Sequence, residues 1–161
     1  MIGRYALLAS RIRQDLAALE RVVDRVERAM QARRVSDEPD LLLDSAALNL
    51  HDFYTGLERI FAQIAANFDQ SVPTGPDSHR ELLRQMTVAI PRLRGQVLSA
   101  GVAAEVDEFL RFRHVVRHVY AFELEPDRVE RVADRLRPTF RNVRAELSAF
   151  AMMLEDLAHA S

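Results

Sequence analysis

Residues 5–30 read YALLASRIRQDLAALERVVDRVERAM, and this stretch decides the fold class. Its apolar side chains recur at steps of three and four residues and therefore form one stripe along a helix, with arginines and acids opposite. The stripe consists of Tyr5, Leu8, Ile12, Leu16, Leu19, Val23, Val26 and Met30. The sequence predicts a long amphipathic helix that ends before Ser36 and Pro39, because proline suits the first turn of a following helix.

The remainder of the chain repeats this helical spacing. Further helices are predicted over about 40–68, 78–90 and 103–122, and from Pro126 to near the end of the chain. No alternating pattern long enough for a strand appears, and glycine and proline, at 5 and 6 residues, are scarce. The expected fold class is all-α, an up-and-down bundle of about five helices in a single domain over residues 1–161.

The composition excludes several kinds of chemistry. All 22 basic side chains are arginine, and the chain has no cysteine. Without lysine there is no Schiff-base enzyme and no P-loop of the usual Gly-Lys-Ser/Thr form. Without cysteine there is no disulfide, thiol nucleophile, iron–sulfur cluster or cysteine zinc site.

The overall charge is close to neutral, with 22 basic and 24 acidic residues and a formal net charge of -2. Any contact with nucleic acid must therefore come from a local basic patch. No apolar run approaches the roughly 18 residues of a membrane span, and the first residues lack the pattern of a secretory signal. These features predict a cytoplasmic protein that does not engage a membrane.

One local basic patch does occur, where residues 111–120 read RFRHVVRHVY. This window holds three arginines, two histidines and no acid, and acidic stretches flank it on both sides. On a helical wheel one side of it is apolar and predicted to face the core, with Phe109, Phe112, Val115, Val116, Val119 and Phe122. The ionisable side chains then turn outward in two flanks, one with Arg113, Arg117 and Tyr120 and the other with Arg111, His114 and His118.

Arg113 and His118 are five residues apart, which is roughly 140° around one helix. A single straight helix cannot easily present both to one small group. A second copy related by a two-fold axis could bring the two flanks together across a cleft. We therefore expect a homodimer if the two residues act together.

Histidine and arginine together suit the cleavage of RNA without a metal. Histidine exchanges protons near neutral pH, with the 2′-hydroxyl or the leaving 5′-oxygen, and arginine stabilises the charge that builds on phosphorus. From the residues alone, however, such a face is more often a solvated helix surface or a protein interface than a nuclease site.

The window also fits the Arg-x4-His-x-Tyr motif of the HEPN superfamily, through Arg113, His118 and Tyr120. The chain most resembles the HepT-like ribonuclease toxins that pair with minimal nucleotidyltransferase antitoxins. Two further stretches carry the resemblance, residues 47–61, ALNLHDFYTGLERIF, and residues 79–83, HRELL.

This resemblance implies a helical, HEPN-like homodimer that cuts RNA without metal or cofactor, leaving a cyclic phosphate and a 5′-hydroxyl. It assigns His118 as general acid/base and Arg113 as phosphate clamp, and His114 fills the place of the polar residue that commonly follows the arginine. Arg111 and Arg117 are extra basic groups at positions that the motif leaves free, and they either support RNA contacts together with His114 or only solvate the helix. The resemblance also makes Tyr120 the hydroxyl to which the antitoxin adds AMP. The alternative function is a non-catalytic helical subunit that docks a nucleotidyltransferase.

Four other polar residues are candidates for supporting positions. Asn49, Asp52 and Arg59 follow one row of the second helix beside Gly56, where a neighbouring helix is expected to approach closely and Asp52 to pair with Arg59. His79 would line the cleft if the third helix packs beside the fourth. No spacing of His, Asp and Glu indicates a metal site.

Overall fold

The computed structural model of the chain describes residues 2–118 and 123–160, and these residues form an all-α bundle. Five α-helices and one π-helical turn follow one another in the described part. They are α1 (Ile2–Arg33), α2 (Pro39–Ile64), η1 (Ala65–Asp69), α3 (Ser78–Met86), α4 (Ala100–His118) and α5 (Pro126–His159). The predicted fold class is confirmed.

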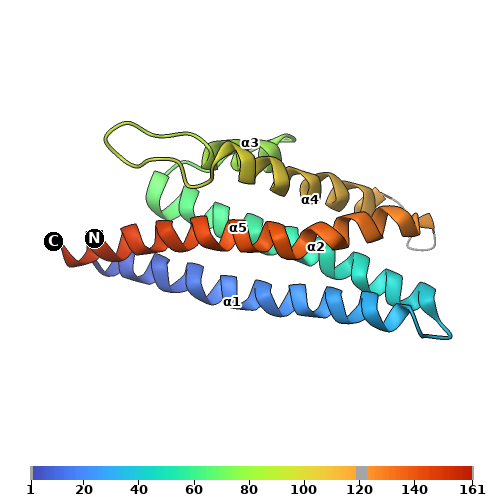
Figure 1. The fold of residues 1–161 in the computed structure, drawn as a ribbon. Helices are drawn as coiled ribbons and strands as arrows, with labels where there is room; N and C mark the ends of the chain where they lie inside the picture. The colour runs from blue at the N-terminus through green and yellow to red at the C-terminus, as the bar shows by residue number, and fades with distance from the viewer. Residues whose placement is uncertain (1, 119–122, 161) are drawn as a thin grey trace.

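The three long helices pack side by side. α1 contacts both α2 and α5 along much of its length, and α3 and α4 lie together against α2 on the side away from α1 (Figure 1). The predicted apolar stripe of α1 is buried from Leu8 to Val26, while Tyr5 and Met30 are half-buried at its ends. Phe53 of α2 packs against two other helices. Its ring centroid lies 5.2 Å from that of Phe109 in α4 and 6.2 Å from that of Phe140 in α5.

The helix boundaries differ from the prediction at the start of α4, which is Ala100 instead of Ala103, and at the ends of two helices. The second helix ends in a π-helical turn instead of continuing as α-helix to Phe68, and Gln70 after it has a left-handed backbone with φ of 58°. The third helix ends at Met86 instead of near Ile90. The loop after α3 accounts for its early end: the carbonyl oxygen of Met86 accepts from the amides of Val97 and Leu98, and the amide of Ile90 donates to Arg94, so the Ile90-to-Met86 bond that would continue the helix is absent.

A buried ion pair fixes the loop between α3 and α4. The guanidinium of Arg94 donates through Nε and Nη2 to both carboxylate oxygens of Asp69, each at 2.7 Å, and the side chains are 0% and 1% exposed. Arg94 Nη1 also donates to the carbonyl oxygens of Val88 and Gly95. Because Asp69 lies in the π-helical turn, this pair joins the end of α2 to the loop that leads into α4.

Gly56 marks the close approach of α1 and α2, as predicted. A Cβ atom built at this position would lie 2.5 Å from Leu19 Cδ2 of α1, which is closer than two carbon atoms can pack. Leu19 is itself 3% exposed and has little room to move. The glycine therefore sets the distance between the two helices.

Gly56→Ala is expected to destabilise the protein by roughly 1 kcal/mol, since overpacking of about 1–3 kcal/mol exceeds the gain of up to about 1 kcal/mol in helix propensity. Gly101→Ala in α4 is the matched control, because nothing lies within 4 Å of a Cβ there. That control should leave stability unchanged or raise it. Urea denaturation followed by circular dichroism compares the two, and equal stabilisation by both substitutions would contradict the prediction.

No helix within the described ranges is both long and apolar enough to cross a membrane.

Candidate functional site

The helix α4 carries Arg113 and His118 of the Arg-x4-His-x-Tyr motif, and its core side agrees largely with the prediction. Phe109 and Phe112 are buried, and Val116 packs against the core from a half-buried position. Val115 was predicted to join them, but it lines a surface cavity instead. Val119, Tyr120 and Phe122 lie outside the described residues.

The polar side of α4 differs from the prediction at Arg113. Arg111, His114, Arg117 and His118 are exposed, as expected, whereas Arg113 is half-buried. It follows Phe109 by four residues and Leu110 by three, so it lies at the edge of the buried stripe. Its Nε atom is buried and has no hydrogen-bond partner in the described part of the chain.

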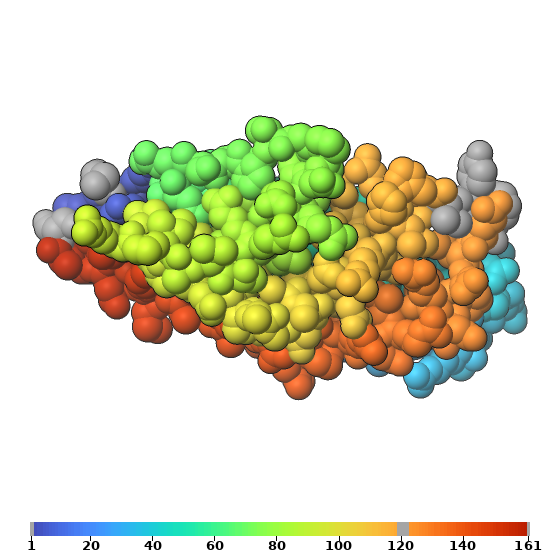
Figure 2. All heavy atoms as spheres, turned by 90° about the horizontal axis from the view of Figure 1, so that it is seen from above, coloured from blue at the N-terminus to red at the C-terminus, as the bar shows by residue number. Residues whose placement is uncertain are grey.

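A cavity of about 400 Å³ opens beside Arg113, between the loop that precedes α3, α3 itself, α4 and the first turn of α5. Figure 2 looks onto this face of the molecule, where α3, α4 and the start of α5 meet. Four arginines, two histidines and one acid supply its ionisable lining: Asp77, His79, Arg80, Arg111, Arg113, His114 and Arg128. We call it the basic cavity.

His79 is held in the basic cavity by a carboxylate of α2. Its Nδ1 atom lies 2.7 Å from Glu58 Oε2, and because an ionised carboxylate only accepts, Nδ1 carries the proton. Glu58 is largely buried, with 19% of its side chain exposed. The other ring nitrogen, Nε2, is then free to accept a proton, or to donate one once the imidazole is charged.

The two histidines of α4 contact each other. The ring centroids of His114 and His118 lie 4.3 Å apart, one helical turn from each other, with an angle of 56° between the rings. His114 lines the basic cavity, and His118 is exposed beside it. Arg113, His114 and His118 are thus grouped at one end of α4, next to His79 of α3.

The arginines of the basic cavity are only partly compensated by acids. Arg111 Nη2 lies 2.9 Å from one oxygen of Asp107, and Arg80 Nη1 lies 3.7 Å from the other. Arg113 and Arg128 form no ion pair among the described residues. The cavity can therefore hold an anion by charge and by the planar geometry of its guanidinium groups.

A comparison with protein families identifies the family to which the chain belongs. The model of the family described as HepT-like protein matches residues 45–154, which include α4 and the whole basic cavity. The chain belongs to the HepT-like family. No curated protein and no solved structure matches it.

Three of the predicted supporting residues of this HepT-like chain do not reach the basic cavity. Asn49 is buried and donates to the carbonyl oxygen of Ser45 at 2.8 Å within its own helix. Asp52 and Arg59 line a different hollow, against α1. They form no ion pair with each other, and Asp52 lies instead 3.7 Å from His51 Nδ1, so the predicted pair is wrong.

Sequence reasoning missed Glu58 and Arg128 as members of this site. Glu58 approaches His79 because α2 and α3 pack together, and Arg128 joins from the first turn of α5. Neither contact follows from spacing along one helix. The ion pair between Asp107 and Arg111 could have been predicted from the sequence, since residues four apart face each other on a helix.

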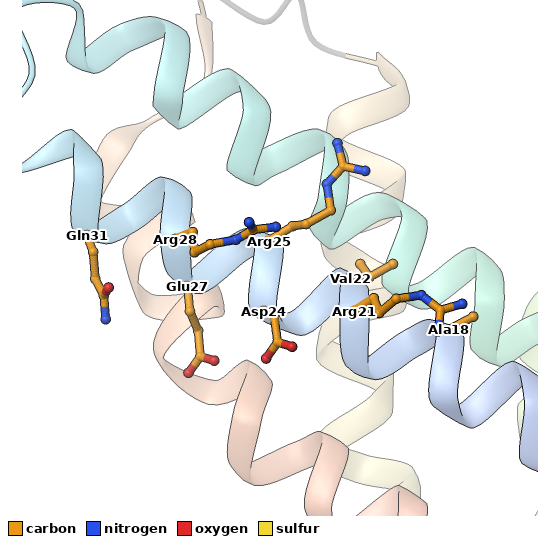
Figure 3. A pocket seen from close by; sticks show the side chains of 8 residues that line it. All are labelled: Ala18, Arg21, Val22, Asp24, Arg25, Glu27, Arg28 and Gln31. Atoms are coloured by element: carbon orange, nitrogen blue, oxygen red, sulfur yellow. The ribbon is translucent and has the colours of Figure 1, made fainter.

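A larger surface hollow than the basic cavity, about 770 Å³, lies elsewhere in this HepT-like chain, along α1 (Figure 3). Side chains of this one helix line it, so no second element closes it, and α1 precedes the matched residues. Two of the lining side chains, Asp24 and Glu27, accept from Arg137 of α5, while Arg25 has no acid partner in the described ranges. We therefore place the functional site at the basic cavity.

Residues that could hold a metal are not grouped in either hollow. Within residues 2–118 and 123–160, no three side chains of His, Asp or Glu lie together in a suitable arrangement. The basic cavity instead groups nitrogen atoms that bind anions.

Tyr54 is buried in the core, near enough to Glu58 and Arg113 of the site to feel their charges. It is 0% exposed, and its hydroxyl has no hydrogen-bond partner in the described part of the chain. Burial raises the pKa of this phenol well above its usual value, and the nearby carboxylate of Glu58 raises it further, while Arg113 opposes the shift. The hydroxyl is therefore a neutral and unsatisfied group in the core.

Tyr54→Phe is expected to stabilise the protein by about 1 kcal/mol at pH 7, because an unsatisfied buried hydroxyl costs about 1–3 kcal/mol. The raised pKa adds a pH dependence: wild-type stability is retained below the ordinary tyrosine value of about 10 and falls as the pH rises above it. The Tyr54→Phe variant should lose less stability above that pH, because it lacks the buried phenol. Urea denaturation between pH 7 and 11 measures both effects, with Tyr5→Phe as control. The chain has no lysine or cysteine, so neither of these side chains titrates in that pH range.

Proposed function

We propose that this HepT-like chain is a toxin that cleaves RNA without a metal, as a homodimer. The observation that supports the proposal best is the basic cavity, which groups Arg113 and His114 of the motif with His79 and adjoins His118. Family membership supports the same function, because HepT-like proteins are typically associated with toxin–antitoxin systems. Its partners would be an RNA substrate, a second copy of the chain and a nucleotidyltransferase antitoxin.

In the proposed reaction, the 2′-oxygen of one nucleotide attacks the adjacent phosphorus and the bond from phosphorus to the 5′-oxygen breaks. One group accepts the proton of the 2′-hydroxyl and another donates a proton to the 5′-oxygen. His118 serves as one of these groups, and Arg113 stabilises the charge on the phosphoryl oxygens. The products are a 2′,3′-cyclic phosphate and a 5′-hydroxyl.

End-group analysis of RNA incubated with the protein in EDTA tests this reaction. Fragments with cyclic phosphate and 5′-hydroxyl ends are expected. Fragments with 5′-phosphate ends, or activity that EDTA abolishes, would contradict transesterification without a metal.

We further propose that the antitoxin transfers AMP from ATP to the hydroxyl oxygen of Tyr120, which loses its proton while pyrophosphate leaves. Tyr120 lies two residues after His118 in the sequence and outside the described residues. The added phosphate would place bulk and negative charge beside the site. Co-expression with a cognate nucleotidyltransferase should increase the mass of the peptide that contains Tyr120 by one AMP. An unmodified peptide from an inactive complex would indicate steric inhibition instead.

The second candidate function is a non-catalytic subunit that docks the nucleotidyltransferase. The partly uncompensated arginines of the basic cavity favour it equally, since they would also hold the phosphates of a nucleotide. Stable complex formation, together with no RNA cleavage by either protein alone, would favour docking over catalysis.

A further inference from the structure

A second hollow adjoins the basic cavity on the face shown in Figure 2. It has a volume of about 260 Å³, lies between α4 and α5, and shares Arg111 and Arg128 with the cavity. It adds Arg131 and Arg135, of which Arg135 is bonded to Glu108. We call the two hollows together the arginine groove.

The arginine groove has more cations than acids. Arg113, Arg128 and Arg131 form no ion pair among the described residues, while Arg80 and Arg111 share Asp107. From Arg128 to Arg135 the helix rises by about 10 Å, whereas successive phosphates of a nucleic-acid strand in a duplex advance by about 3.4 Å. The groove is thus long enough to contact more than one phosphate of the same strand.

The groove offers few accessible apolar side chains to a protein partner. Leu110 and Phe112 line it but are 7% and 1% exposed, Val115 and Val132 are half-buried, and Pro76 at its edge is exposed. Interfaces between proteins usually have an apolar centre with a polar rim. A surface whose accessible groups are mainly guanidinium and imidazole suits the backbone of a nucleic acid better.

We infer that the arginine groove is a phosphate-binding subsite for a nucleotide chain, complete within one protomer and anchored by Arg128. Arg128 is half-buried, lines both hollows and lies outside the Arg-x4-His-x-Tyr motif. The inference rests on the proposed function only for the identity of the chain as RNA. Binding at the subsite requires no cleavage and no second protomer.

The binding of a fluorescent oligodeoxynucleotide, measured by anisotropy over a range of salt concentrations, tests the subsite. This probe lacks the 2′-hydroxyl and cannot undergo the proposed cleavage. Arg128→Gln should weaken binding by about tenfold or more, since a hydrogen bond to a charged group is lost. The substitution should also make the slope of log affinity against log salt concentration smaller by about one, because one phosphate contact is lost.

Arg25→Gln is the matched control, because it removes the same charge from the hollow on α1, on a different helix. It should change the affinity less than twofold and leave the salt dependence unchanged. Arg131→Gln, an exposed position, provides a second variant in the groove if Arg128→Gln alters helicity. Equal losses in Arg25→Gln and in the groove variants would overturn the inference, because net charge alone would then explain the binding.

Two further outcomes separate the inference from the proposed function. If the wild-type protein binds the probe through Arg128 but does not cleave RNA, the subsite stands and the proposed function fails. If it cleaves RNA while both groove variants bind the probe like the wild type, the subsite fails and the function stands. Equally strong competition by a polyglutamate peptide of matched charge would indicate an acidic protein partner and overturn the assignment to a nucleotide chain.

Discussion

Replacing His118 by alanine is expected to lower RNA cleavage by at least about a hundredfold, because general acid–base catalysis contributes about 10²–10⁴ in rate. His118 is exposed at the end of α4, and its ring contacts that of His114, which is also exposed, so the substitution should leave the fold intact. The rate of cleavage of a labelled RNA in EDTA measures the effect. Far-ultraviolet circular dichroism checks that helicity is unchanged.

His159→Ala is the matched control for this variant. His159 is also exposed, but it lies at the end of α5 and its Nδ1 bonds to the carbonyl oxygen of Glu155 at 2.6 Å, within its own helix. Cleavage by this control should equal that of the wild type. Full activity in folded His118→Ala protein would remove the assignment of His118 as a proton-transfer group.

Replacing Arg94 by methionine is expected to destabilise the protein by about 3–5 kcal/mol, which is the usual cost of removing one partner of a buried ion pair. The loss leaves the carboxylate of Asp69 buried without its partner, and the carbonyl oxygens of Val88 and Gly95 lose their donor. The melting temperature should fall by about 10 °C. Thermal denaturation followed by circular dichroism provides the measurement.

Arg84→Met is the control for this effect, since Arg84 pairs with Glu81 on the exposed face of α3, where solvent screens the pair. Its cost should be about 0–1 kcal/mol. Asp69→Leu combined with Arg94→Met should cost less than the sum of the two single substitutions, because no unpaired charge then remains. Additive costs would show that the two side chains do not depend on each other.

The helices could be predicted from the sequence because their apolar stripes are long and regular. The stripe of α1 and the glycine at its crossing with α2 are properties of spacing and residue size, and both were correct. The shorter α3 and the π-helical end of α2 were missed. These features depend on contacts in three dimensions, such as the one between Asp69 and Arg94, and not on periodicity.

The site was predictable to the extent that it lies on one helix. The motif residues on α4 and the chemistry of histidine and arginine were evident from spacing, and His79 was expected nearby if α3 packed beside α4, as it does. Glu58 and Arg128 were not predictable, since each reaches the basic cavity from another helix. Asp52 and Arg59 failed as candidates because their row of α2 faces α1.

The π-helical turn at Ala65–Asp69 has a consequence for the evolution of this family. Such a turn accommodates one more residue than the regular helix, and removing it would rotate the following side chains by about 100°. Asp69 would then no longer point at Arg94, which lies 25 residues further along the chain. Among related sequences, we expect the extra residue, the aspartate and the arginine to be inherited together and lost together.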